Sequence, residues 1–227
     1  MSNEPGALGW TPGPVDERDR ALSAFAPEEP VLTGEKGWGW RGMPDINQLN
    51  EGACTSFAIG NSVNCEPRRQ SVESELCFDA YHATTQRDEF WGDWQSGQEG
   101  TSLRSAMKEW QRRGVIGSYA FSYSVEEVVT WILTKGPVCL GVRWWTGMDD
   151  PSEENDWYIE PTGLIRGGHA ICVPRVHWNM GDENFVVLLN SWGRENWGIN
   201  GRAKLSEESL RALLEDDPNG TAIASVD

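Results

Sequence analysis

The 227-residue chain has few basic side chains: 19 lysines and arginines stand against 35 aspartates and glutamates, a net charge of −16. Such a surface repels phosphate backbones and anionic lipid, so we expect neither nucleic acid nor a membrane as a partner. Long apolar runs are also missing, because the longest, residues 128–133 and 185–189, fall far short of the roughly 20 residues that span a bilayer.

The chain also lacks a basic segment followed by an apolar stretch at its start, so it shows no Sec-type signal peptide. We therefore expect a cytoplasmic or viral location, and a monomer. A length of 227 residues fits one domain, or one enzyme built from two small lobes.

Cysteine and histidine are scarce, with five and three copies and no C-x-x-C pair. This excludes a disulfide scaffold and disfavours a structural zinc site, so we expect no metal and no cofactor. Four of the cysteines fall in expected helices or apolar strands and are assigned to the core. These four are Cys65, Cys77, Cys139 and Cys172.

Helical patterns come first and strand patterns second. The clearest helix covers residues 101–113, where apolar side chains recur at i, i+3, i+4 and i+7. Ser124 and Glu127 form a capping box at the start of a second expected helix. Further helices are expected at 16–25, 54–65, 73–84 and 207–215, strands at 138–145, 169–178, 185–190 and 201–205, and an acidic tail at the end.

This order predicts an α+β fold of two lobes that meet in a cleft. An extended N-terminal lead-in would cover residues 1–40. The main domain, 41–227, would consist of a helical lobe at about 41–136, an antiparallel β-rich lobe at about 137–215 and the acidic tail.

Cys54 follows Gly-Ala at the first turn of an expected helix. Unpaired backbone N–H groups at such a position stabilise a thiolate and lower the pKa of the thiol, although a buried structural cysteine would fit this position alone equally well. A nucleophilic cysteine also needs a base and a group that orients the base. His169, after two glycines at the start of a strand, and Asn190, at the end of the next strand, are candidates for these roles.

Three motifs occur in the order that the papain-like cysteine peptidases show. They are Gln48 with Gly52-Ala53-Cys54, then Gly168-His169-Ala170, then Asn190-Ser191-Trp192-Gly193 continuing to Trp197-Gly198-x-x-Gly201. The chain thus resembles the papain and cathepsin superfamily, in the form of a bacterial, archaeal or viral member without a long pro-region. Glu51 and Thr55 depart from the family pattern but remove no catalytic group.

The resemblance implies a two-lobed papain-like fold with the active site in the cleft, and a polypeptide substrate. Cys54 would be the nucleophile, His169 the base and Asn190 the group that orients it. Gln48 would form the oxyanion hole with the Cys54 N–H. Trp192 would cover the His169–Asn190 hydrogen bond and, with Gly100, contribute to substrate binding.

Two other functions stay open at this stage. The same nucleophile could serve a cell-wall peptide endopeptidase or amidase. A non-catalytic structural or binding protein could also retain the fold, although the intact set of Cys54, His169, Asn190 and Gln48 disfavours this alternative.

Overall fold

The computed structural model describes residues 6–227 except 15, 98 and 182. Its centre is an antiparallel sheet of seven strands in the order β2-β7-β3-β4-β5-β6, with β1 paired to β4. The strands are β1 (Gly34–Gly37), β2 (Tyr119–Ser122), β3 (Val138–Trp145), β4 (Ile165–Trp178), β5 (Phe185–Leu189), β6 (Arg202–Ser206) and β7 (Thr221–Ser225).

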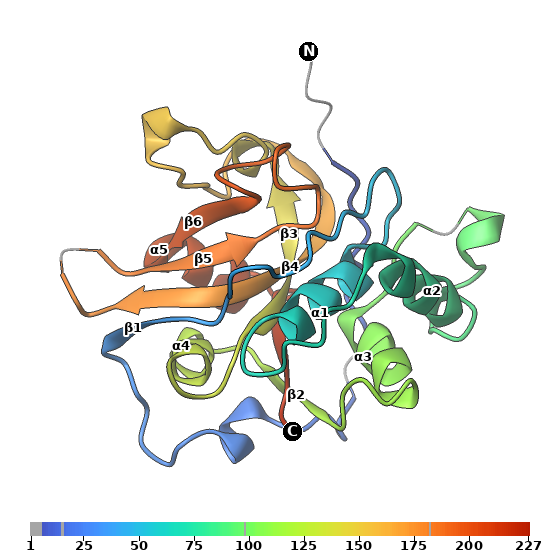
Figure 1. Ribbon diagram of the computed structural model, residues 1–227, viewed down its shortest axis with the longest axis horizontal. Coiled ribbons are helices and arrows are strands. Elements are labelled where there is room, and N and C mark those ends of the chain that lie inside the picture. Colours follow the sequence, from blue (N-terminus) through green and yellow to red (C-terminus); the bar gives the residue numbers. More distant parts are fainter. Residues whose placement is uncertain (1–5, 15, 98, 182) are drawn as a thin grey trace.

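The helices gather on two sides of this sheet (Figure 1). Three of them, α1 (Cys54–Asn64), α2 (Ser74–Thr85) and α3 (Leu103–Arg112), form one half of the molecule, and α4 (Val125–Thr134) lies against the sheet in the other half. The short α5 (Glu207–Arg211) follows β6. The expected α+β class is confirmed. In the part of the chain described here, no helix is long and apolar enough to cross a membrane.

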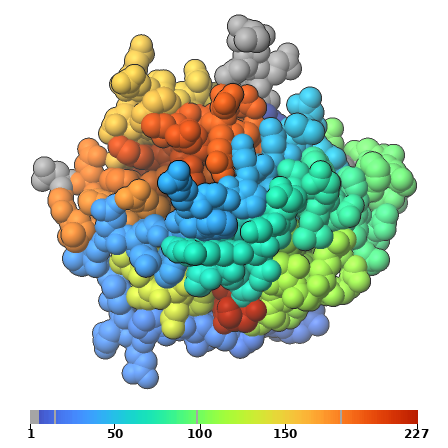
Figure 2. Space-filling view, viewed as in Figure 1, coloured from blue at the N-terminus to red at the C-terminus, as the bar shows by residue number. Residues whose placement is uncertain are grey.

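Two large apolar clusters form the core. The larger combines the sheet with α4 and includes Trp144 and Ile132; the smaller lies among α1, α2 and α3 and includes Phe57 and Trp110. On the face seen in Figure 2, the teal and green helical segments lie on one side and the orange strands on the other. In this arrangement the start of α1 lies opposite β4.

Most expected elements occur, with shifted ends. The strand at 138–145 has the expected bounds, and the helix expected at 101–113 starts at Leu103 because Ser102 accepts from the Ser105 N–H and caps it. Ser124 likewise caps α4. The Glu127 carboxylate, however, accepts from the Ser122 hydroxyl, so the expected capping box is only half formed.

Three expectations were wrong. The helix expected at 16–25 is only a 3₁₀ turn at Leu22–Phe25, and the strand expected from residue 169 already begins at Ile165. The C-terminal region is not simply an acidic tail, because β7 lies between β2 and β3 with Ala222, Ile223 and Ala224 buried. These small apolar residues are joined to the sheet by long-range pairing, which the surrounding acidic sequence hides.

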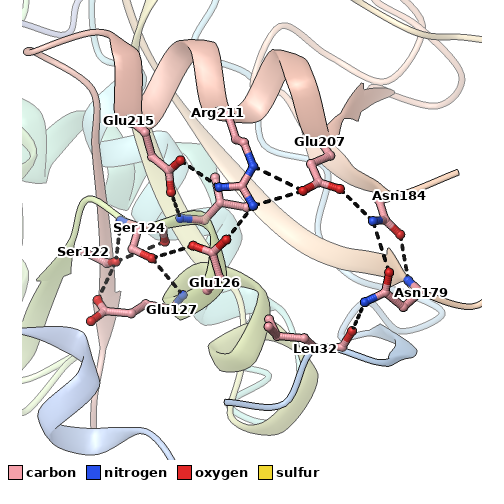
Figure 3. Close-up of polar contacts among 11 residues, drawn as sticks. Leu32, Ser122, Ser124, Glu126, Glu127, Asn179, Asn184, Glu207, Arg211 and Glu215 are labelled. Carbon is pink, nitrogen blue, oxygen red and sulfur yellow. Dashed lines mark hydrogen bonds and ion pairs between the residues drawn. The ribbon is translucent and has the colours of Figure 1, made fainter.

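A polar network connects the segment that begins with α5 to the start of α4 (Figure 3). Arg211 pairs with Glu207 and Glu215 on its own segment and with Glu126 at the start of α4, at 2.5 Å. Glu207 in turn accepts from the Asn184 amide, at the base of the β4–β5 connection. The network therefore links three segments that are distant in sequence.

Candidate active site

Cys54 is the first residue of α1 and is completely buried. Its sulfur accepts a hydrogen bond from the backbone N–H of Ala170, at 3.3 Å. Ala170 lies on β4 directly after His169, so the start of α1 meets the strand that carries the expected base.

His169 lies within β4, opposite Val142 of β3, rather than at the start of a strand. Its Nε2 is 2.8 Å from Asn190 Oδ1. The same Oδ1 accepts from the Ser191 N–H, which identifies it as an acceptor, so Nε2 carries the proton. His169 Nδ1 is buried and has no hydrogen-bond partner in the described part of the chain. Nδ1 is therefore the ring nitrogen left to take a proton.

Tryptophans surround the imidazole. The Trp192 ring lies 5.0 Å from the His169 ring, and Trp144 packs edge-on at 4.8 Å. Both indoles are buried, so the imidazole is enclosed by apolar rings on these two sides. Trp192 was expected at this place from its motif. Trp144 was one of several tryptophans that could line a cleft or pack in the core, and the β3–β4 pairing brings it to the imidazole.

Gln48 is also completely buried, and its amide is held from both ends. The Ser191 hydroxyl donates to Oε1 at 2.6 Å, and Nε2 donates to the Glu51 carbonyl at 2.8 Å and the Ala7 carbonyl at 3.1 Å. Ser191 thereby fixes which end of the amide carries the donor. No role for Ser191 was expected, although its position beside Asn190 is the signal that could have identified it.

Residues 7–11 of the N-terminal segment lie between the loop that precedes α1 and strand β4. The Ala7 carbonyl accepts from Trp192 Nε1 at 3.0 Å as well as from Gln48. The Gly9 and Trp10 N–H groups both donate to the Gly168 carbonyl, and the Gly9 carbonyl accepts from the Thr101 N–H. The dark blue segment enters close to the start of α1 (Figure 1). This cover explains the complete burial of Cys54 and His169.

Burial also sets the protonation states of Cys54 and His169. It raises the pKa of the Cys54 thiol to about 12, although the N–H groups of Ala170 and Gly9 oppose the shift. It lowers the pKa of His169 to about 4, although the bond to Asn190 opposes this shift. In the covered state both groups are neutral. The lowered thiol pKa expected from the helix N-terminus is therefore not found in this state, because desolvation outweighs the helix contribution.

The architecture matches several solved structures. Xylellain, a cysteine protease from Xylella fastidiosa, superposes with a TM-score of 0.65 at 14% identity, covering 100% of this chain and 99% of that one. Digestive procathepsin L 3 of Tenebrio molitor larval midgut gives a TM-score of 0.60 at 13% identity, covering 97% and 75%. The chain has a papain-like fold.

A third structure, the proform of the ragweed pollen cysteine protease Amb a 11, gives a TM-score of 0.59 at 15% identity, covering 94% of this chain and 64% of that one. No family model and no curated protein matches the sequence itself. The papain-like fold thus rests on the structure, and it agrees with the expected two-lobed architecture.

Within this papain-like fold, the structure brings Gln48, Cys54, His169 and Asn190 into one buried cluster. Gly100 lies beside it with φ +97°, and a Cβ there would come within 2.1 Å of the Gly9 carbonyl oxygen. Only glycine allows the backbone of the N-terminal segment to approach so closely. Among the described residues no group of histidine, cysteine, aspartate or glutamate is arranged to hold a metal ion.

Proposed function

We propose that the chain is a cysteine peptidase that cleaves peptide bonds through a Cys-His-Asn mechanism. The observation that carries the proposal is the orientation of His169. Its Nε2–H donates to Asn190 Oδ1, and its Nδ1 has no hydrogen-bond partner among the described residues. The next residue along β4, Ala170, donates its backbone N–H to the Cys54 sulfur. The papain-like fold, shared with proteins named as cysteine proteases, supports the same conclusion.

In this mechanism His169 Nδ1 takes the proton from Cys54, and the resulting thiolate attacks the carbonyl carbon of the substrate. The oxygen of that carbonyl becomes negative and accepts from Gln48 Nε2 and the Cys54 N–H. Each donor of this kind contributes about 3–4 kcal/mol to the transition state. His169 then gives its proton to the departing amine, and water hydrolyses the thioester.

The supporting residues have distinct parts in this scheme. Asn190 accepts the hydrogen bond from Nε2 and so fixes the orientation of the imidazole, which leaves Nδ1 to take the proton. Ser191 holds the Gln48 amide with Nε2 toward the cleft. Because the thiol is neutral while it is buried, the thiolate–imidazolium pair forms only after the cleft is opened to water or substrate.

The first test is alkylation by a peptidyl epoxide, with the labelled cysteine located by peptide mass. All five cysteines are buried, so the other four serve as internal standards for reactivity that burial alone would allow. We expect Cys54 to be labelled first, and the labelling to collapse in His169→Ala. Equal labelling of several cysteines, or labelling that ignores the His169 change, would contradict the proposal.

The completely buried thiol is what a non-catalytic binding protein would also show, so this alternative is tested at the same time. Casein-type peptides and cell-wall stem peptides are offered side by side to the wild type and to Cys54→Ser. Turnover that Cys54→Ser abolishes supports a peptidase, and the preferred peptide separates a general peptidase from a cell-wall enzyme. Binding without turnover in both chains would favour the non-catalytic protein.

A further inference from the structure

We propose that Glu51 and His82 are positioning residues for the oxyanion donors. The hydrogen bond between their side chains holds residues 48–53, the donor loop, so that Gln48 Nε2 and the Cys54 N–H point at one substrate oxygen. This inference rests on the proposed peptidase function. It assigns a part in that function to two side chains outside the Cys-His-Asn set.

The backbone of Glu51 connects the two proposed donors. Its carbonyl accepts from Gln48 Nε2 and from the Ala53 N–H, each at 2.8 Å, and its N–H donates to the Gln48 carbonyl at 3.2 Å. One of the two Nε2 hydrogens is thereby fixed, which leaves the other for a substrate oxygen. Because Ala53 directly precedes Cys54, a displacement of Glu51 would move both donors.

The tip of the donor loop faces solvent. Leu49 is 63% exposed, and Asn50 is exposed as well. Leu49 also has φ +54°, a left-handed conformation that is unfavourable for a residue with a side chain. A contact from outside the loop at Glu51 therefore restricts a segment whose tip gains little from packing.

The Glu51 side chain makes this contact with α2, the helix that lies beside α1 (Figure 1). Its Oε1 is 2.5 Å from Nε2 of His82, in the last turn of α2, and the two side chains are 34% and 26% exposed. A carboxylate only accepts hydrogen bonds, so Nε2 carries the proton. Such a short, charge-assisted bond between partly buried groups fixes the position of both side chains.

Aromatic contacts hold His82 in turn. Its ring stacks on Trp94, with the ring centres 3.8 Å apart and 14° between the planes. The preceding residue, Tyr81, accepts from the Gly100 N–H at 2.9 Å. Two adjacent residues of α2 therefore contact the backbone beside the candidate site, one at the donor loop and one at Gly100.

The test compares wild type with four variants of the full chain. Glu51→Ala and His82→Phe remove the hydrogen bond, and phenylalanine keeps a ring that can stack on Trp94. Glu51→Gln keeps an acceptor, and His82→Gln keeps a donor without the ring. Turnover of a quenched peptide gives kcat and KM for each chain.

The donors act on the transition state, so the loss should appear in kcat. We expect Glu51→Ala and His82→Phe to lower kcat by roughly 10- to 100-fold with KM within about threefold of wild type. Glu51→Gln and His82→Gln should stay within about fivefold of the wild-type kcat. A His82→Phe chain that is more active than His82→Gln would show that His82 acts through packing, and would overturn the proposal.

His177 provides a matched control at the end of β4. It pairs with Glu35 at 3.5 Å and stacks on Phe185 at 5.1 Å, so its surroundings resemble those of His82 away from the donor loop. His177→Phe and Glu35→Ala should leave kcat within about twofold of wild type. A fall as large as that in His82→Phe would assign the effect to general destabilisation and refute the positioning role.

The double variant Glu51→Ala/His82→Phe measures whether the two side chains act as one unit. If they do, its kcat should lie within about threefold of the lower single variant. Losses that multiply would show that the two residues act separately, which would overturn the proposal.

Alkylation of Cys54 by iodoacetamide separates this inference from the function on which it rests, because the reaction needs the thiolate but forms no oxyanion. Its rate in Glu51→Ala should stay within about threefold of wild type. An equal fall in alkylation and kcat, or labelling of the other four cysteines, would mean a damaged thiolate or unfolding and would refute the positioning role.

An unchanged kcat in Glu51→Ala would refute the positioning role and leave the peptidase standing. A Cys54 that is unreactive in wild type would instead refute the peptidase, and this inference with it. A wild type that is labelled at Cys54 but hydrolyses no peptide would show that the donor loop supports no oxyanion, which also refutes the inference.

Discussion

The buried imidazole of His169 makes the stability of the fold depend on pH. Burial lowers its pKa to about 4, from 6.5 for a ring in water. Between these values the unfolded chain binds more protons than the folded one, because the folded ring stays neutral. The contribution of His169 to stability is therefore complete above pH 6.5 and is lost as the pH falls toward 4.

The size of the loss follows from the two pKa values. At about pH 5 the ring is almost fully protonated in the unfolded chain but mostly neutral in the folded one. One pKa unit corresponds to about 1.4 kcal/mol, so the free energy of unfolding falls by about 2 kcal/mol through this group between about pH 7.5 and pH 5. Most of this loss occurs below pH 6.5, the ordinary pKa of the ring.

The assay is urea unfolding of wild type and His169→Gln at both pH values. Glutamine does not titrate, and its amide can donate to Asn190 Oδ1. His82 and His177 are present in both chains, so their contributions cancel. The stability advantage of wild type over the variant should shrink by about 2 kcal/mol on acidification. An advantage that is equal at the two pH values, within about 0.5 kcal/mol, would refute a neutral buried imidazole.

Three further predictions concern individual polar side chains. Ser191→Ala should lower kcat about tenfold with little change in KM, because Gln48 loses its partner at 2.6 Å; an unchanged kcat would exclude this positioning role. Trp110→Phe removes the donor to the Ser56 hydroxyl at 3.0 Å and should cost about 2 kcal/mol in urea unfolding; a loss below about 0.5 kcal/mol would mean that this bond adds nothing. Arg211→Met should cost about 1 kcal/mol, since the pairs in Figure 3 are partly exposed, and the loss should shrink in about 1 M salt; a loss that does not depend on salt would point to packing instead.

Local patterns predicted the elements whose causes are local. The i, i+3, i+4, i+7 spacing and the Ser102 cap specify α3, and the Ser124 cap specifies α4, because side chains and backbone donors within a few residues settle both. The strand β7 escaped prediction because Ala222, Ile223 and Ala224 gain their burial from β2 and β3, which are far away in the sequence.

The candidate site was accessible from sequence through its motifs. The order of Gln48, Cys54, His169 and Asn190 indicated residues that the structure indeed brings together, in the β-rich half and at the start of α1. Their protonation was not accessible. The helix N-terminus argued for a low thiol pKa, whereas burial raises the pKa of Cys54 to about 12.

Local sequence signals were enough to predict the α+β class, the starts of α1, α4 and α5, and the motifs that the candidate site contains. Three contacts could be found only from the folded chain: the Ala7 carbonyl against Gln48, the Trp10 ring against Gly141 and Gly168, and the Ser191 hydroxyl against Gln48. The two groups of features differ in the sequence distance over which their interactions act. Capping and periodicity act over a few residues, whereas burial, and the pKa shifts that follow from it, depend on which distant segments come into contact.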